Sequence, residues 1–293
     1  MSEKTIALIG LDTSHTVEFA KLMQHPEHRV VEGMRATKAL RFPSAFQPEE
    51  GQDQRQAELE GMGVEMAPDI LFAVDDVDAV FIEINDPALH LEYYEKVAPL
   101  GLPVFIDKPL AASTEDGRRI MALAEEHGTP TWSSSSLRFI PPLIEAKQQI
   151  ASPLLAQTFG ALGQAAAGSD LIWYGVHAVE MLVTALGTGA QSVSALSDES
   201  GIVLSVAYDD ERRGLVECRR GFYAYGGRMQ SKDALAFFDS TGNSPYASLM
   251  QALREFVMDG TVPVPLSEAQ EVMAILEAGE RAVATGEPTA VTP

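Results

Sequence analysis

The chain has 293 residues, 46% of them hydrophobic, and a formal net charge of −21. The length is enough for two domains that each bury a core. The charge argues against nucleic acid and anionic membrane surfaces as partners, because both attract a basic protein face. The single cysteine, Cys218, cannot form an internal disulfide. With no signal peptide and no apolar run of about 18 residues, a cytoplasmic protein with no membrane span is expected.

The first apolar run, residues 5–10, predicts a buried parallel strand that ends at Gly10. A helix capped by Thr13 or Ser14 follows. In dinucleotide-binding domains this turn carries three glycines, so that a pyrophosphate can approach the backbone. Asp12 and His15 occupy the other two glycine positions here. The residues expected to contact a dinucleotide are Gly10, Asp12, Thr13, Ser14 and His15, and the alternative is an ordinary capped turn.

A second strand is expected at residues 29–34, followed by the bases Arg35, Lys38 and Arg41. An acid after this strand binds the ribose hydroxyls of NAD, whereas an arginine suits the 2′-phosphate of NADP. Arg35 therefore favours NADP, and a solvated basic loop is an equal alternative. The polar stretch 42–60 predicts a loop that leads to a short helix at 55–61.

Two further strands, at residues 76–84 and 104–107, each lead into a polar turn. Ligands of open α/β sheets bind at the carboxyl edge, so Lys108 is expected to hold its ammonium there. The next helix begins at a capping box formed by Ser113 and Asp116 and ends at Gly128. Alternating strands and helices predict a doubly wound parallel sheet over residues 1–132.

The second domain is expected at residues 133–293. Strand-like runs recur from residue 193 to 239, with turns expected at 209–210, 226–227 and 241–243. They predict a mostly antiparallel sheet in an α+β domain, with helices at 143–150, 246–258 and from 267 to 285. One face of such a sheet is available to a second subunit, so a homodimer or homotetramer through this sheet is expected.

A helix is also expected around residues 176–186, with apolar side chains on one face and His177 and Glu180 on another. Histidine accepts a proton near neutral pH, and a structural His177 is the alternative. Trp173 offers a wall for a sugar ring, and Tyr174 is a second candidate for proton transfer. His25 and His28 have ligand-like spacing but no third ligand in the sequence, so no metal site is expected.

Three segments resemble the glucose–fructose oxidoreductase and inositol dehydrogenase family (Gfo/Idh/MocA). Asp107-Lys108-Pro109 resembles the family's Glu-Lys-Pro signature, with Asp in place of Glu. Residues 85–90 resemble its turn of a polar residue, a proline and a histidine. Gly175 and His177 match its Asp-x-Gly-x-His segment, in which Trp173 occupies the aspartate position. The likeness extends over nearly the whole chain.

The resemblance implies a dehydrogenase that uses NADP or NAD, with a sugar, polyol or related hydroxy compound as the small-molecule substrate. Lys108 and His177 would be catalytic. Residues near the cofactor would be Asn85, Pro87, His90, Asp107, Lys108 and Pro109. Residues near the substrate would be Arg138, Trp173, Tyr174 and Glu180. The altered glycine turn and the missing aspartate motivate two alternatives: a non-catalytic protein that binds a dinucleotide or sugar, and a non-redox glycosidase or lyase that retains NAD.

Overall fold

The computed structural model describes residues 3–242 and 244–293, which form two compact units. The first runs from the N-terminus to Ser133 and includes Tyr246–Leu266; the second comprises Ser134–Pro245 and Ser267–Pro293. The break after Ser133 lies beside the boundary expected at residue 132. The expectation of two consecutive domains differs from the structure at Tyr246–Leu266, which belongs to the first unit.

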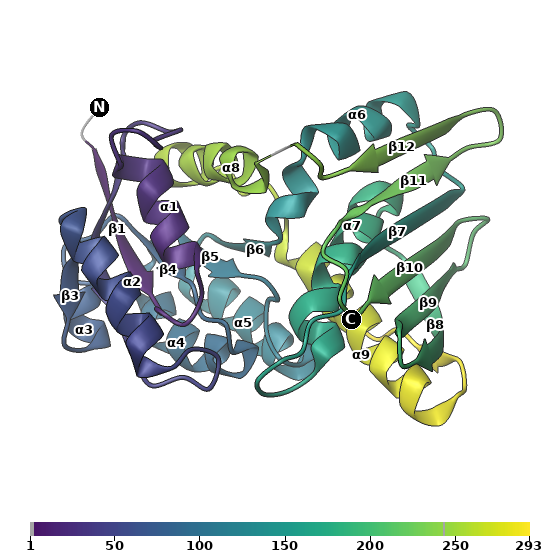
Figure 1. Cartoon of the computed structure of the whole chain (residues 1–293), viewed down its shortest axis with the longest axis horizontal. Helices are drawn as coiled ribbons and strands as arrows, with labels where there is room; N and C mark the ends of the chain where they lie inside the picture. Colours follow the sequence, from purple (N-terminus) through teal and green to yellow (C-terminus); the bar gives the residue numbers. More distant parts are fainter. Residues whose placement is uncertain (1–2, 243) are drawn as a thin grey trace. The chain divides into compact units, whose positions relative to one another are not determined.

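A six-stranded sheet in the order β3-β2-β1-β4-β5-β6 forms the centre of the first unit (Figure 1). Its strands are β1 (Lys4–Ile9), β2 (Met34–Leu40), β3 (Glu65–Ala67), β4 (Ala79–Ile82), β5 (Val104–Asp107) and β6 (Thr131–Ser134). The pairs β1–β2, β1–β4, β2–β3 and β4–β5 are parallel. Strands β2 and β3 lie on one side of β1, and β4, β5 and β6 lie on the other. Ligands of such sheets bind at the switch point between β1 and β4. The predicted doubly wound parallel sheet is confirmed.

The helices of this unit are α1 (His15–Gln24), α2 (Glu49–Gly61), α3 (Ile70–Ala73), α4 (His90–Val97), α5 (Thr114–His127) and α8 (Pro245–Asp259), with 3-10 turns η1 (Pro87–Leu89) and η2 (Ala98–Leu100). The predicted capping box is present, because the Ser113 hydroxyl accepts the backbone N–H of Asp116. Helix α8 joins this unit through specific contacts: Arg254 Nε donates to the Glu32 carbonyl at 2.9 Å, and the Phe256 ring lies 5.9 Å from that of Trp132.

The position expected for the second strand is wrong. Val30 N–H and Arg29 N–H donate to carbonyls at the end of α1, so residues 29–33 turn instead of pairing. Strand β2 begins at Met34, which places Arg35 at its amino end and exposed. The residue that follows the carboxyl end of β2 is Arg41. Arg35 therefore does not follow the carboxyl end of β2, where an arginine would suit the 2′-phosphate of NADP.

A seven-stranded sheet in the order β12-β11-β7-β10-β9-β8-β13 forms the second unit. Its strands are β7 (Leu155–Ala161), β8 (Ala190–Asp198), β9 (Gly201–Tyr208), β10 (Arg213–Arg219), β11 (Gly226–Gln230), β12 (Leu235–Asp239) and β13 (Thr289–Ala290). Only β7 and β10 pair in parallel among the recorded pairs of this sheet. The mostly antiparallel sheet is thus confirmed.

The turn expected at Gly226-Gly227 is wrong, because these residues begin strand β11. A Cβ at Gly227 would lie 2.2 Å from the Gln157 carbonyl, so the glycine allows β11 to pair closely with β7.

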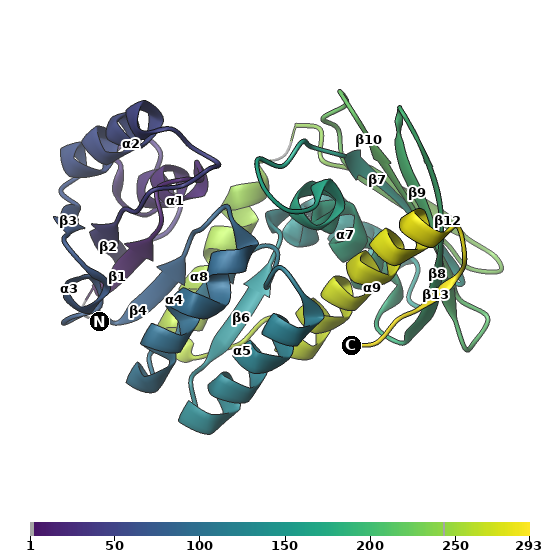
Figure 2. The ribbon, with the colours of Figure 1, turned by 90° about the horizontal axis from the view of Figure 1, so that it is seen from below.

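The helices of the second unit are α6 (Pro141–Gln149), α7 (Val176–Leu186) and α9 (Leu266–Thr285), with a 3-10 turn η3 (Ser136–Phe139) and a π-helical turn η4 (Leu171–Gly175). Helices α7 and α9 lie along one face of the sheet (Figure 2). Glu271 of α9 accepts the backbone N–H groups of Gly189 and Ala190 at 2.6 and 2.9 Å, which fixes α9 against β8. Within residues 3–242 and 244–293, no helix has the length and apolar character needed to cross a membrane.

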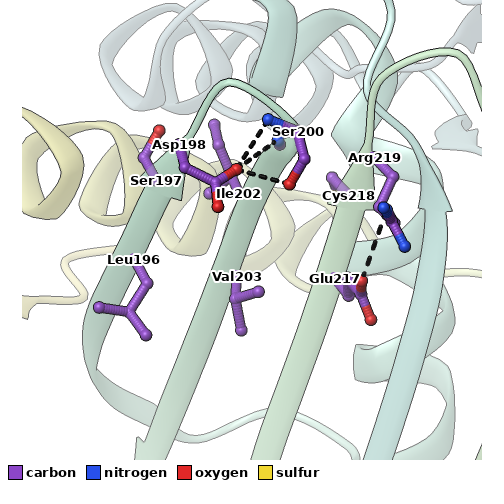
Figure 3. Close-up of a pocket in the computed structure, with 10 residues that line it drawn as sticks. Leu196, Ser197, Asp198, Ser200, Ile202, Val203, Glu217, Cys218 and Arg219 are labelled. Carbon is purple, nitrogen blue, oxygen red and sulfur yellow. Dashed lines mark hydrogen bonds and ion pairs between the residues drawn. The ribbon is translucent and has the colours of Figure 1, made fainter.

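The opposite face of this sheet carries exposed apolar side chains. Leu196, Val203 and Phe237 have exposed fractions of 76%, 39% and 71%. A hollow of about 360 Å³ lies among residues of β8, β9 and β10 (Figure 3), where the Asp198 carboxylate accepts hydrogen bonds from Ser200. Assembly through this face stays a prediction.

Candidate functional site

The turn after β1 is shaped by close contact with the end of β4. Gly10 has φ +116°, and a Cβ there would lie 2.2 Å from the Glu83 carbonyl oxygen. Only glycine fits such a position. Asp12 is 1% exposed, and its carboxylate accepts from the Ser44 hydroxyl at 2.7 Å and the Asn85 N–H at 2.9 Å. Burial raises the pKa of Asp12, and these hydrogen bonds oppose that shift. Its charge is therefore held by internal donors.

Arg55 of α2 brings a cation to the same turn. Its Nη1 donates to the Leu11 carbonyl at 2.8 Å. Burial lowers the pKa of Arg55, whereas Asp12 and Glu58 raise it. Arg55 was not among the predicted site residues, because the polar pattern of residues 42–60 does not indicate which helical face meets the turn.

The start of α1 adds hydrogen-bond donors to this turn. Ser14 is exposed, and its side chain makes no capping hydrogen bond. The buried Thr13 hydroxyl accepts the His15 N–H at 3.2 Å. A helix N-terminus, a free hydroxyl and a guanidinium together fit a dinucleotide diphosphate, even though Asp12 and His15 replace two glycines.

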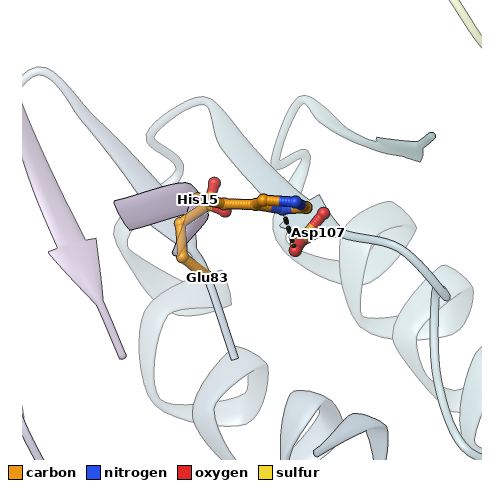
Figure 4. A group of neighbouring side chains, drawn as sticks. All are labelled: His15, Glu83 and Asp107. Carbon is orange, nitrogen blue, oxygen red and sulfur yellow. Dashed lines mark hydrogen bonds and ion pairs between the residues drawn. The ribbon is translucent and has the colours of Figure 1, made fainter. Parts of the chain in front are cut away.

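His15 and Asp107 form a short contact at the carboxyl edge of the sheet (Figure 4). His15 Nδ1 lies 2.7 Å from Asp107 Oδ2, and the other carboxylate oxygen accepts the Lys108 N–H at 2.8 Å. The imidazole stacks on Phe19 at 5.7 Å and meets the edge of Tyr246 at 5.2 Å. Burial acts to raise the pKa of Asp107, but His15 and Lys108 outweigh it and lower that pKa to about 2.

Glu83 is the first residue after β4, and its side chain is fully buried beside this pair. Within the described residues, neither of its carboxylate oxygens has a hydrogen-bond partner. Burial, and next the Asp107 carboxylate, raise the pKa of Glu83 well above its usual value, while Lys108 opposes the shift. The sequence analysis placed Glu83 inside the strand at 76–84 and missed it as a site residue. The available signal was a lone acid in an apolar run.

Lys108 follows Asp107 and is 6% exposed. The Lys108–Pro109 peptide bond is cis. Its ammonium donates no hydrogen bond to any residue in the part of the chain that the structure describes, so its N–H groups are available to a ligand. The loop that carries it is fixed by the fully buried His90, whose Nδ1 lies 3.2 Å from the Leu110 carbonyl and whose Nε2 lies 2.8 Å from the Ile84 carbonyl.

The structure thus brings most of the expected cofactor residues to one edge. Asn85 contacts Asp12 twice, because its side chain also donates to the Asp12 carbonyl at 3.3 Å, and Gly10 lies against the Glu83 carbonyl. Pro87 lies in the buried first turn after Asn85. Arg35, at the amino end of β2, is the expected cofactor residue that does not lie at this edge.

In the second unit, His177 is held by a residue that the sequence analysis missed. His177 Nδ1 lies 2.7 Å from the Ser135 hydroxyl, which also accepts the Leu137 N–H at 3.2 Å. The Ser135 N–H donates to Glu180 at 2.7 Å. His177 and Glu180 were expected to share a helical face, and the structure connects the two through Ser135. The serine run 133–136 was the visible signal, without indicating which serine points to the histidine.

Arg138, expected near the substrate, lies between two acids. Its guanidinium is 3.6 Å from the Glu180 carboxylate and hydrogen-bonds to Glu268 of α9. Arg138 is 8% exposed. These contacts connect η3, α7 and α9 within the second unit.

Aromatic rings surround His177. The rings of Tyr174 and Tyr225 each lie 5.5 Å from its imidazole, and Trp173 lies 4.7 Å from Tyr174. A Cβ at Gly163 would lie 2.8 Å from the Trp173 ring, so this glycine allows the close approach of its loop. Burial raises the pKa of Tyr174, which disfavours the phenolate base that it was a candidate to provide.

Comparison with known proteins finds similarity to one family over the first part of the chain. Residues 4–134 match the model of the GFO/IDH/MocA family, described as an oxidoreductase family with an NAD-binding Rossmann fold. A 2,7-anhydro-N-acetylneuraminate hydratase of Mediterraneibacter gnavus is 31% identical over 117 residues, which cover 40% of this chain and 30% of the hydratase. An uncharacterised protein of Saccharomyces cerevisiae, YMR315W, is 25% identical over 252 residues, covering 73% of this chain and 64% of that protein. The matches thus span less than two thirds of these relatives.

Solved structures share the fold over the whole chain. GenD2 from gentamicin A biosynthesis, in complex with NAD, has a TM-score of 0.83 and 16% identity over 100% of this chain and 97% of its own. Scyllo-inositol dehydrogenase from Lactobacillus casei, with NAD(H) and scyllo-inositol bound, has a TM-score of 0.81 and 14% identity, with 99% of both chains covered. At this identity the likeness shows the fold alone.

Proposed function

We propose that this chain, whose residues 4–134 belong to the GFO/IDH/MocA oxidoreductase family with its NAD-binding Rossmann fold, is a dehydrogenase that acts on a sugar, polyol or related hydroxy compound. The observation that carries the proposal is the position of Lys108, a nearly buried ammonium directly after β5, at the edge where ligands of such sheets bind. A nicotinamide cofactor supplies hydride acceptance or donation when it is bound.

Lys108 stabilises negative charge that develops on the substrate oxygen. Its N–H groups have no partner in residues 3–242 and 244–293, and the loop that carries it is fixed through His90. A preorganised donor of this kind stabilises the transition state more than the ground state. Lys108 is therefore the residue whose removal most reduces turnover.

His177 is proposed to exchange the hydroxyl proton. Its Nδ1 lies 2.7 Å from the Ser135 hydroxyl, which orients the ring. The Ser135 hydroxyl can accept the Nδ1–H, which leaves the lone pair on Nε2, the tautomer that a base requires. The rings of Trp173, Tyr174 and Tyr225 offer apolar faces to the C–H groups of a sugar or polyol.

Arg55 and the first turn of α1 are proposed to hold the diphosphate. Arg41, which follows β2, is the base nearest to the position that selects between NAD and NADP, but its guanidinium is already paired with Asp53 at 2.5 Å and with Gln56 at 3.1 Å. We therefore infer that NADH binds at least as tightly as NADPH, in contrast to the preference that Arg35 suggested.

The test begins with titration of the protein with NADH and NADPH, followed by fluorescence, and then assays turnover of a panel of sugars and polyols. Lys108→Ala is expected to lower turnover by about 10²–10³-fold, the loss typical of one oxyanion-stabilising donor. Lys96→Ala is the matched control, since Lys96 is exposed and pairs with Glu92 on α4. Binding of neither cofactor, or full activity of Lys108→Ala, would refute the proposal.

A second candidate is a non-redox enzyme that retains its cofactor, and the similarity to a hydratase over 117 residues favours it. Such an enzyme consumes substrate while the absorbance of reduced nicotinamide, at about 340 nm, shows no net change. Cofactor that co-purifies with the protein would support this reading. A protein that binds NADH but turns over no member of the panel would instead be a binding protein.

A further inference from the structure

We propose that His15, Glu83 and Asp107 form a binding site for a divalent transition-metal ion of the zinc or manganese class. The three residues lie at the carboxyl ends of the neighbouring strands β1, β4 and β5 (Figure 4). The proposal goes beyond the dehydrogenase activity and does not depend on it, because the site is built from protein ligands alone.

The ligand atoms are close to the separation that one ion requires. The imidazole nitrogen and one carboxylate oxygen from each acid all lie within 4.8 Å of one another. Metal–nitrogen and metal–oxygen bonds of about 2.0–2.2 Å place the ligand atoms of a tetrahedral ion about 3.3–3.6 Å apart. Side-chain rotations that bring the atoms together by about 1 Å would close the site.

Glu83 is the observation that points to a cation. Its side chain is fully buried, lies in this cluster, and has no hydrogen-bond donor for either oxygen in the described residues. Asp107, by contrast, faces His15 and accepts the Lys108 N–H. Burying an unmatched carboxylate is costly, and an ion coordinated by Glu83 would remove that cost.

The ligand types select the ion. One imidazole and two carboxylates form a borderline donor set that suits Zn²⁺, Mn²⁺ or Co²⁺ better than the all-oxygen sets preferred by Ca²⁺ and Mg²⁺. Two carboxylates neutralise the charge of the ion.

The experiment uses the full chain after treatment with a chelator. Titration with ZnCl₂ by calorimetry is expected to show one site, and CoCl₂ is expected to give visible d–d absorption bands that report nitrogen and oxygen ligation. Glu83→Gln and His15→Gln are each expected to weaken Zn²⁺ binding by at least about tenfold. Because Glu83→Gln keeps the shape of the side chain and removes a buried charge, it is expected to fold, and circular dichroism checks this.

The matched control is the double variant His25→Ala/His28→Ala. These two rings lie 4.7 Å apart near the surface of the same unit and could bind an ion adventitiously. The proposal predicts that this variant binds Zn²⁺ like the unmodified chain.

Absence of Zn²⁺ and Co²⁺ binding by the unmodified chain would overturn the proposal, as would binding that is lost in the control or kept in both Glu83→Gln and His15→Gln. If either cluster variant fails to fold, the other still decides, together with the rise in melting temperature that Zn²⁺ is expected to give the unmodified chain. Titration with NADH is a separate readout, so failure of the metal site and failure of the dehydrogenase proposal are distinguishable.

Discussion

Glu83 and Glu180 are both buried glutamates, with exposed fractions of 0% and 4%, in different surroundings. Glu180 accepts the Ser135 N–H at 2.7 Å and lies 3.6 Å from the Arg138 guanidinium. Glu83 accepts no hydrogen bond from the residues that the structure describes, and the carboxylate of Asp107 is close to it. A buried charge with a well-placed partner is tolerated, whereas one without a partner is costly.

The difference separates a carboxylate with internal partners from one without them. In the second unit, the acids around Arg138 fix η3, α7 and α9 to one another. At the carboxyl edge of the first sheet, the side chains of Glu83 and Lys108 make no hydrogen bond with the residues that the structure describes. Unmatched groups of this kind concentrate where a ligand completes the set.

Arg138→Ala is expected to have the largest effect on stability. It leaves Glu180 and Glu268 without their cation, and removing one partner of a buried ion pair typically costs about 3–5 kcal/mol. The free energy of unfolding, measured in urea by circular dichroism, reports the loss. Arg281→Ala is the control, since the Arg281 side chain is exposed and its i,i+4 pair with Glu277 is expected to contribute about 0.5 kcal/mol or less. A loss below about 1 kcal/mol for Arg138→Ala would contradict the claim that its ion pairs stabilise the second unit.

Asp107→Asn tests the matched acid of the first unit, and it is best made in the Glu83→Gln background. The Asp107 carboxylate helps to raise the pKa of Glu83, so both groups would otherwise contribute to the pH dependence. The pKa of Asp107 is lowered from 3.8 to about 2, so its charge stabilises the folded state above pH 3.8. That contribution, about 2 kcal/mol, is lost as the pH falls from 3.8 towards 2. The unfolding free energies of the two proteins should converge over that range, and a constant difference would contradict the assignment.

Much of the fold could be predicted because local signals agreed with the final structure. Helix α5 has a capping box at Ser113 and a left-handed glycine at Gly128, and both ends are where these residues place them. Strand β2 was misplaced because Val30 and Val31 favour a strand, while in the structure their N–H groups donate to the end of α1. Tertiary contacts override β-propensity in such cases.

The sequence allowed single site residues to be predicted, but not the way in which they come together. Lys108 was visible because it follows a strand in a recognisable motif. The cluster of His15, Glu83 and Asp107 was not visible, because the sequence places His15 at a helix start and the two acids at strand ends but does not show that β1, β4 and β5 are neighbours. Strand order, and hence which strand ends meet, is set by long-range packing.

Glu83→Gln is expected to raise the free energy of unfolding, whereas Arg138→Ala and Asp107→Asn are expected to lower it. In the presence of a chelator, this substitution removes an unmatched buried charge and is expected to raise the free energy of unfolding by about 1–2 kcal/mol at neutral pH. The pKa of Glu83 is raised in the folded state, so folded protein binds the proton more tightly and stability falls as the pH rises above 4.5. The variant should not show this fall. Urea unfolding of both proteins between pH 4.5 and 8 measures the difference, and a variant that is less stable throughout would show that Glu83 is matched after all.

Ser135→Ala is expected to have the smallest effect on stability and separates the two roles of the Ser135 network. The substitution removes the hydroxyl that accepts the Leu137 N–H, and loss of such a cap costs about 1 kcal/mol. The backbone N–H to Glu180 is retained, so the ion pairs around Arg138 should persist. Ser134→Ala is the control, because the hydroxyl of this buried neighbour makes only a long, 3.4 Å contact with the Ser135 carbonyl. If His177 is the proton acceptor, Ser135→Ala should also shift the pH profile of turnover, since the hydroxyl no longer fixes Nδ1, whereas a purely structural serine would lower stability and leave that profile unchanged.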